Sequence, residues 1–272
     1  MLSLTTLFGP SLRIGVSRRG LALLRVGRRR AGSAAVLADI HWTDDAAPEQ
    51  IAARLAAALA EARCGGMRAR LLLADDLVRY FMVTPPANAG SLRDCRAAAE
   101  MRFQALYGEP IAGWRLEADW QARAPFLACA MPASLLNMLC SALSERRLAP
   151  VELVPQFIAG WNRWRRKLRG DAWFGVVHDH GMTVGAIHQG HLRAVRPLAI
   201  AAGDFDPARL HAMLMREALL LDIPAPARLQ LVGSVPAGLT TPSSGALRCE
   251  WIGGTPPAGT AGIELARTGS PA

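Results

Sequence analysis

Residues 173–197 read WFGVVHDHGMTVGAIHQGHLRAVRP, and this stretch is the strongest indicator of the fold in the sequence. Three short apolar runs alternate with two turn-forming segments, Asp179-His180-Gly181 and Gln189-Gly190. Short apolar runs between such turns are typical of strands, so we predict a three-stranded meander. A turn of the form Asp-x-Gly-x-Thr, here Asp179, Gly181 and Thr183, can present backbone N–H groups and a hydroxyl to a phosphate.

Strand patterns elsewhere in the chain predict two lobes and an insertion, an α/β protein overall. Residues 12–40 read as three short strands, and a helix and a buried strand follow them. Residues 75–149 differ, because they predict a β-α-β-β-α unit whose first helix begins at Ser91, with Asp94 completing a capping box. We therefore divide the chain into a first lobe (1–74), an inserted subdomain (75–149), a second lobe (150–253) and a flexible tail (254–272).

The composition is that of a globular chain with a substantial core. Of its 272 residues, 51% are hydrophobic and 19% charged. Because no apolar run approaches the ~20 residues needed to cross a bilayer, and the N-terminus lacks a basic leader, we expect a cytoplasmic location. The five cysteines form no CxxC pair, so neither a zinc site nor a redox motif is predicted.

The formal charge of +9 comes almost entirely from arginine, since Lys167 is the only lysine. A Walker A loop and a protein kinase each need a lysine in a setting that Lys167 lacks. Near it, Arg165 and Arg166 interleave with Trp161 and Trp164 on a predicted helix. Either the tryptophans pack inward and the cations are solvated, or these cations contact anionic lipid heads or an acidic partner. Nucleic acid is the least favoured partner.

No residue pattern predicts a catalytic or metal centre. The chain has no GxSxG, HExxH or GxGxxG motif. We interpret the adjacent carboxylates Asp75 and Asp76 as turn and cap residues. Histidines cluster between positions 178 and 191, but no cysteine or glutamate joins them as a further ligand.

Taken together, the two meander halves and the inserted unit resemble the actin-like superfamily, whose two-lobed fold is ribonuclease H-like. Within it the chain is most similar to the pilus-assembly protein PilM, its relatives HofM and MshI, and the cytoplasmic domain of the secretion protein GspL. The resembling segments are Leu12–Val26, Asp75–Pro86, Ala97–Glu109, Phe126–Phe157 and Phe174–Pro197.

The resemblance implies a nucleotide site that has lost a key group. PilM-like proteins begin with a strand reading I-G-(I/L)-D-x-G-S/T, whose aspartate supports the nucleotide-bound metal, whereas Ile14 to Gly20 here read IGVSRRG. The matching positions that would line a nucleotide are Ser17, Arg18, Asp179, Gly181, Thr183 and Gly233. Without the aspartate we expect ATP binding to be weak or absent, no hydrolysis, and no cofactor or metal. A divergent ATPase or small-molecule kinase remains the alternative.

The resemblance also implies a partner. PilM-like proteins act at the inner membrane and bind the N-terminal cytoplasmic peptide of the membrane protein PilN in a cleft beside the inserted subdomain. By this likeness the chain is a scaffold that is peripheral to the inner membrane, with indirect membrane association. Candidate groove residues are Tyr80, Met82, Leu135 and Met138. The machine served, whether type IV pilus, MSHA pilus, type II secretion or DNA uptake, stays open.

Overall fold

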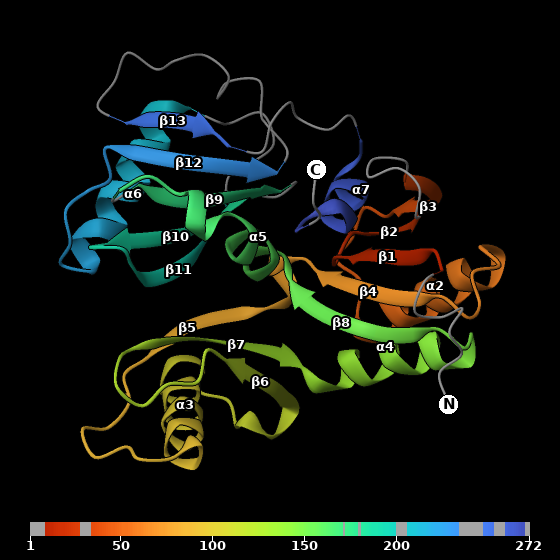
Figure 1. Cartoon of the computed structure of the whole chain (residues 1–272), viewed down its shortest axis with the longest axis horizontal. Helices are drawn as coiled ribbons and strands as arrows, with labels where there is room; N and C mark the ends of the chain where they lie inside the picture. Colours follow the sequence, from red (N-terminus) through yellow and green to blue (C-terminus); the bar gives the residue numbers. More distant parts are fainter. Residues whose placement is uncertain are drawn as a thin grey trace.

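The computed structural model describes residues 9–27, 34–170, 172–178, 181–199, 206–233, 247–252 and 259–269. Three sheets organise these residues (Figure 1). Two five-stranded sheets, with strand orders β3-β2-β1-β4-β8 and β11-β10-β9-β12-β13, form the two lobes. A three-stranded sheet of order β5-β7-β6 forms the insertion. None of the helices within the described ranges has the length and apolarity that crossing a membrane requires.

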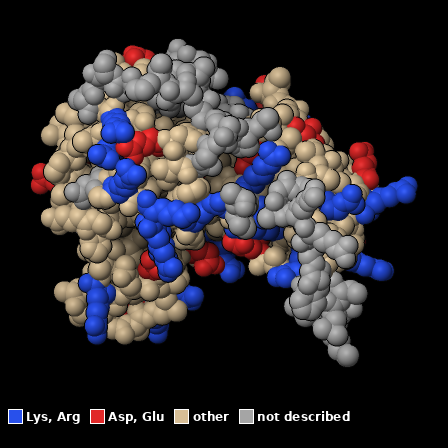
Figure 2. All heavy atoms as spheres, turned by 45° about the horizontal axis from the view of Figure 1, so that its top comes forward, with Lys and Arg blue, Asp and Glu red and all other residues tan. Residues whose placement is uncertain are grey.

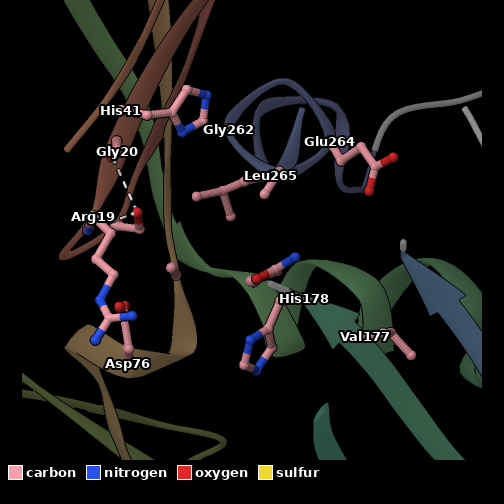
Figure 3. A pocket seen from close by; sticks show the side chains of 13 residues that line it. Arg19, Gly20, His41, Asp76, Val177, His178, Gly262, Glu264 and Leu265 are labelled. Carbon is pink, nitrogen blue, oxygen red and sulfur yellow. Dashed lines mark hydrogen bonds between the residues drawn. The ribbon is translucent and has the colours of Figure 1, made fainter. Parts of the chain in front are cut away.

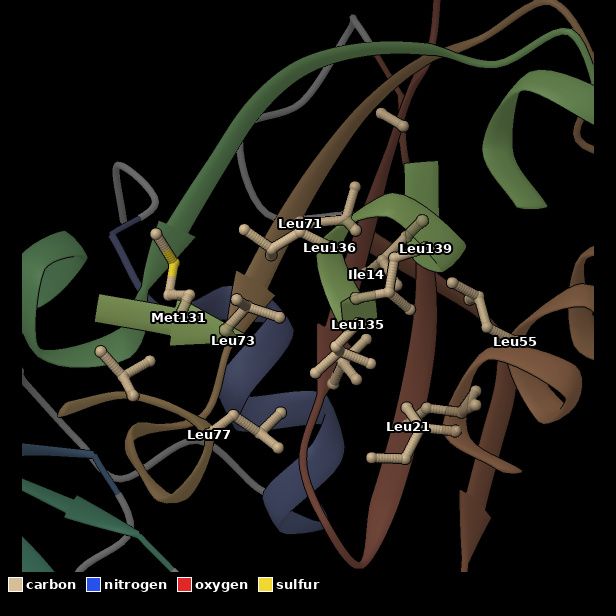
Figure 4. Packing of buried hydrophobic residues seen from close by; sticks show 14 of the residues in the cluster. Ile14, Leu21, Leu55, Leu71, Leu73, Leu77, Met131, Leu135, Leu136 and Leu139 are labelled. Carbon is tan, nitrogen blue, oxygen red and sulfur yellow. The ribbon is translucent and has the colours of Figure 1, made fainter. Parts of the chain in front are cut away.

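The first sheet is sandwiched between helices. Its strands are β1 (Ser11–Val16), β2 (Gly20–Val26), β3 (Ala34–His41), β4 (Arg68–Leu73) and β8 (Ala149–Pro155), and its helices are α2 (Pro48–Glu61), α4 (Ala133–Glu145) and α7 (Ala261–Arg267). Strand β1 is antiparallel to β2 and parallel to β4. Leucines on alternate positions of β4 meet leucines of α2 and α4 in the largest core (Figure 4). On the other face, α7 contacts β1 and β2.

The second sheet contains the predicted meander. Its strands are β9 (Trp173–His178), β10 (Gly181–His188), β11 (His191–Ala199), β12 (Arg228–Gly233) and β13 (Arg248–Trp251). Helix α6 (Pro207–Leu220) begins at the predicted cap Asp206, whose side chain accepts hydrogen bonds from the N–H groups of Ala208 and Arg209. Leu210 and Leu214 of this helix pack into a separate core beneath the sheet. Helix α5 (Gln156–Trp164) and the short η3 (Arg165–Lys167) connect the two sheets.

The insertion is a sheet with one helix packed on it. Its elements are η1 (Asp75–Leu77), β5 (Arg79–Val83), α3 (Leu92–Tyr107), η2 (Ile111–Gly113), β6 (Trp114–Ala118) and β7 (Phe126–Pro132). The predicted capping box is confirmed: Ser91 Oγ accepts from the Asp94 N–H, and the Asp94 carboxylate accepts from the Ser91 N–H. Helix α3 ends at Gly108, whose φ of 68° is the left-handed conformation that glycine adopts without penalty.

Long-range pairing moves two of the predicted boundaries. Strand β8 pairs with β4, and α4 packs on α2, so residues 133–155 belong with the first sheet and a division at position 150 cuts through it. The predicted flexible tail is also wrong for residues 261–267, because they form α7 against β1 and β2. Both relationships join segments more than 70 residues apart, which local sequence patterns do not report.

Candidate functional site between the two sheets

The β1–β2 hairpin forms one wall of the cleft between the sheets, and its turn is closed by its own hydrogen bonds. The Ser17 N–H and Ser17 Oγ both donate to the Gly20 carbonyl, at 2.9 and 3.1 Å. The Arg19 N–H donates to Ser17 Oγ at 3.2 Å, and the Arg18 N–H donates to Asp76 Oδ2 at 3.2 Å. The three N–H groups of the turn at positions 17, 18 and 19 are therefore all used within the chain.

The two arginines of this turn are tied to neighbouring segments rather than aimed at a ligand. Arg18 Nε donates to the Asp76 carbonyl at 3.1 Å, and Arg19 Nε donates to Asp45 Oδ1 at 2.7 Å. Trp42 binds the carbonyls of both arginines through its backbone and indole N–H groups. The predicted nucleotide residues Ser17 and Arg18 thus belong to a turn whose polar groups already have partners.

The opposite wall comes from the second sheet. His178 ends β9, and Gly181, with a φ of 147°, begins β10 directly across from it. Asp179, which the sequence assigns to this turn, lies outside the described residues. Thr183 lies inside β10 with no exposed surface, and its hydroxyl approaches the Asp75 carboxylate rather than the turn.

Gly233 brings the end of β12 against this wall. A Cβ at Gly233 would lie 2.1 Å from the Val177 carbonyl oxygen, and its φ is 103°, so only glycine fits. Of the residues that the sequence assigned to a nucleotide site, Ser17 lines the cavity between the sheets, whereas Gly181 and Gly233 pair with His178 and Val177, which line it from the second sheet. In open α/β sheets the carboxyl ends of the strands are where ligands usually bind.

The space left between the walls is small. A cavity of about 40 Å³ lies here, bounded within the described ranges by both walls and by α7 (Figure 3). Its lining is Ser17, Arg19, Gly20, His41, Ala74, Asp76, Gln156, Val177, His178, Ala261, Gly262, Glu264 and Leu265. Sites for drug-sized ligands usually measure about 300–1,000 Å³, whereas this one has room for a few water molecules.

Asp76 is a titratable group at this cavity that the sequence did not assign to the site. Burial raises the pKa of Asp76, opposed by the Arg18 N–H and by the charges of Arg18 and His178. Its Oδ1 is buried and accepts no hydrogen bond from the described residues. A signal was available: Asp76 follows the carboxyl end of a buried strand that runs parallel to its neighbour, where functional groups gather in such sheets.

The predicted partner residues do not form one exposed surface. Tyr80 is 5% exposed and Leu135 is fully buried in the first core, so the prediction that these two side chains line an open groove is wrong. Met82 and Met138 are partly exposed. Met82 pairs across strands with Leu127, also partly exposed, on the sheet face that points away from α3.

The predicted anionic-surface residues Arg165, Arg166 and Lys167 are all exposed in η3. The tryptophans beside them are partly buried and pack against the first core. Trp161 stacks on Phe157, with ring centroids 6.3 Å apart. The inward-packing interpretation of this helix is therefore confirmed for its tryptophans, while a contact with an anionic partner stays a prediction.

Comparison with solved structures identifies proteins that share this fold. The sequence matches no family model and no curated protein. A Bacteroides thetaiotaomicron protein described as having an actin-like ATPase fold and unknown function superposes with a TM-score of 0.58 and 13% identity over 88% of each chain. The cytoplasmic domain of EpsL, an inner-membrane component of the type II secretion system of Vibrio cholerae, gives 0.57 and 12%, covering 95% of this chain and 93% of that one.

A third similar structure is a PilM–PilN type IV pilus biogenesis complex. It superposes with a TM-score of 0.57 and 17% identity, covering 89% of this chain and 88% of that one. Each of the three likenesses covers 88% or more of this chain. The chain has the actin-like ATPase fold.

Proposed function

We propose that this chain is a scaffold of a pilus or secretion assembly platform, which holds the N-terminal cytoplasmic segment of an inner-membrane, PilN-like partner and works at the cytoplasmic side of that membrane. The fold is shared, over most of both chains, with the EpsL cytoplasmic domain and with the PilM–PilN complex. The same fold is also found in ATPases. Whether this chain is a scaffold or an ATPase therefore has to be argued from its nucleotide cleft.

One observation argues most strongly for a scaffold: the N–H groups of Ser17, Arg18 and Arg19 all donate within the chain. A phosphate-binding loop needs free N–H groups that converge on the anion. Here the turn would have to break these bonds and the cavity would have to widen before a triphosphate could enter. The strand that leads into the turn also offers no carboxylate for a metal ion. We therefore infer a pseudo-ATPase.

The inserted sheet offers a surface for the partner segment. Met82 and Leu127 form a partly exposed cross-strand pair on the face away from α3. Apolar side chains of this kind can seat an extended or helical peptide. Of the residues predicted to line the groove, we keep Met82 in the proposed surface. Tyr80 and Leu135 are buried, so we propose Leu127 as the residue beside Met82.

Titration of the full chain with synthetic peptides tests this proposal. The probes are the first residues of each single-span membrane protein encoded next to this chain. We expect one peptide to bind, Met82→Arg to abolish its binding, and Met101→Arg to leave it intact, because Met101 lies on α3 and is 64% exposed. If no such peptide binds at high micromolar concentration, or both variants bind equally, the proposed groove is wrong.

The partly buried Asp76 favours a second candidate, a divergent ATPase or kinase. Its unbonded Oδ1 lies at the cavity, and His178 is near enough to lower its pKa. Calorimetry with Mg-ATP separates the two roles. A scaffold gives no binding heat and no phosphate release, whereas turnover that disappears in Asp76→Asn would establish the enzyme.

A further inference from the structure

A hollow of about 610 Å³ lies on the first sheet, on the face that also carries α7, and is distinct from the cleft between the sheets. It is lined by Arg70, Glu152, Ala159, Asn162, Arg163, Lys167 and Gly269. Strands β4 and β8 form its floor, and α5 with η3 forms one wall. Basic side chains are abundant across the middle of the molecule in the view of Figure 2.

Positive charge in this hollow exceeds negative charge. Arg13 of β1 lies beside the lining residues, and its pKa is lowered by burial and then by the charges of Arg70 and Arg163. Glu152 is the only acidic side chain among the lining residues, and its Oε2 pairs with Arg70 Nε at 2.8 Å. Three cations that line the hollow, with Arg13 beside them, thus face one carboxylate, and the repulsion among the positive charges would be relieved by an incoming anion.

Two of the cations are held in position by one aromatic ring. The guanidinium carbon of Arg163 lies 5.0 Å, and Nζ of Lys167 lies 5.1 Å, from the centroid of the Trp164 ring. Trp164 itself packs against the first core. Cations that are fixed before a ligand arrives lose less side-chain entropy on binding than freely rotating ones.

The floor of the hollow ends at a sheet edge that is unpaired within the part of the chain that the structure describes. Strand β8 is the outermost strand of its sheet, and no strand of the described ranges pairs with its outer side. On this edge Val151 is 50% exposed and Glu152 is also exposed. An extended peptide that joined β8 would place alternate side chains on the face that carries Glu152 and Arg70.

We propose that this hollow and the β8 edge together form a docking site for an extended acidic segment of a partner protein. The segment's backbone lies along β8 and its carboxylates meet Arg70, Arg163 and Lys167, where arginine can bind them in bidentate pairs. The edge of β8, which no strand of the described ranges pairs with, favours a peptide over a lipid surface, because its backbone groups can pair with an extended chain. The site is separate from the inserted sheet and does not depend on the proposed scaffold role.

Fluorescence anisotropy with a labelled decapeptide of alternating Glu and Thr tests the docking site on the full chain. We expect Arg70→Gln/Arg163→Gln to weaken binding by about tenfold or more, since two charge-assisted contacts are lost. Arg123→Gln/Arg193→Gln removes the same charge from two exposed arginines elsewhere and should leave binding unchanged. Glu152→Gln should tighten binding, because it removes the internal competitor for Arg70.

Two further peptides distinguish backbone pairing with the edge of β8 from attraction by charge alone. A decapeptide with Gln in place of Glu should not bind, and one with Pro in place of each Thr should bind at least about tenfold more weakly, because proline lacks the N–H that pairs with β8. Equal losses in both double variants would mean that net charge alone acts. Binding of phosphatidylglycerol vesicles or single-stranded DNA, but not of the acidic peptide, through Arg70 and Arg163 would also overturn the proposal. Should that double variant fail to fold, the Glu152→Gln result decides.

Discussion

The backbone N–H of Phe157 donates a 2.9 Å hydrogen bond to Oδ1 of Asp75, although 82 positions separate the two residues. The same carboxylate accepts from the Tyr80 hydroxyl. Asp75 follows the end of β4, and Phe157 lies in the first turn of α5, the helix that leads to the second sheet. A buried carboxyl therefore fastens the start of the insertion to the connection between the lobes.

Burial raises the pKa of Asp75 above its ordinary 3.8, against hydrogen bonds from the Tyr80 hydroxyl and the Phe157 N–H that lower it. The folded chain then holds this proton to higher pH than the unfolded chain, so the contribution of Asp75 to stability falls as pH rises above about 4. Asp75→Asn keeps an acceptor oxygen and carries no charge. We expect its free energy of unfolding in urea, relative to the parent chain, to improve between pH 4 and pH 7.

Asp75→Ala is the matched comparison, because it leaves the Tyr80 hydroxyl and the Phe157 N–H without their acceptor. An unsatisfied buried donor costs about 1–3 kcal/mol, so this variant should be less stable at every pH. The charge of Asp75 helps to raise the pKa of Asp76, and both variants remove that charge, so the effect of Asp76 cancels when the two variants are compared with each other. If Asp75→Asn is as unstable as Asp75→Ala at pH 7, the ionised carboxylate is itself required, and the pKa of Asp75 is not raised in the folded chain.

Close contact between β1 and α7 leads to a second prediction. A Cβ at Gly15 would lie 2.8 Å from the Gly262 carbonyl oxygen and 2.9 Å from the Ala266 backbone nitrogen. Backbone cannot yield as a flexible side chain can, so Gly15→Ala should lower the free energy of unfolding by about 1–3 kcal/mol and expose residues 259–269 to proteases. Gly27→Ala, where no atom of the described residues lies within 4 Å of the added Cβ, should change neither measurement.

How much of this structure the sequence could predict depends on the range of the interactions. The meander of β9 to β11 and the capping box of α3 arise from residues close in the chain, and both were predictable. The pairing of β8 with β4 and the packing of α7 on β1 are long-range, and local patterns placed both segments elsewhere. The fit of Gly15 to α7 becomes visible only when both segments are in place.

The candidate site shows the same contrast between what the sequence predicts and what depends on long-range contacts. Sequence likeness assigned Ser17, Gly181 and Gly233 to one site; in the structure Ser17 lines the cavity, and the two glycines pair with its lining residues His178 and Val177. It could not show that the N–H groups of the first turn are already bonded, because their partner Asp76 lies 58 residues beyond Arg18. For the same reason Tyr80 appeared available for a partner, although its hydroxyl is committed to the buried Asp75.

Arg79 supports a third prediction, because it anchors the aromatic core of the insertion. Its guanidinium carbon lies 4.2 Å from the Trp114 ring centroid and 4.6 Å from that of Tyr107, and its Nη2 pairs with Glu109 Oε1 at 2.8 Å. Lysine keeps the charge but not the planar fork that stacks and pairs at once, so Arg79→Lys should cost about 1–2 kcal/mol of unfolding free energy.

Arg115→Lys is the control for Arg79→Lys. Arg115 pairs with Glu117 at 2.9 Å, but its side chain is 68% exposed, and exposed ion pairs contribute about 0–1 kcal/mol. Both variants are measured by urea unfolding followed through tryptophan fluorescence. Equal losses from the two lysine variants would show that stacking on Trp114 contributes nothing beyond the ion pair.

Cysteine reactivity gives the last prediction, because it reports whether the insertion stays closed on the first lobe. Cys129 of β7 is 7% exposed, and burial, followed by the charges of Glu117 and Asp75, raises its pKa to about 12. Since the thiolate is the reactive species, Cys129 should resist an aromatic disulfide reagent at pH 8. The partly exposed Cys140 should react first, and Cys140→Ser should remove this fast phase of the labelling reaction. All five thiols should react in urea. Rapid native labelling of Cys129 would mean that β7 opens away from the first core, and that the sheet carrying Met82 and Leu127 moves as a separate unit.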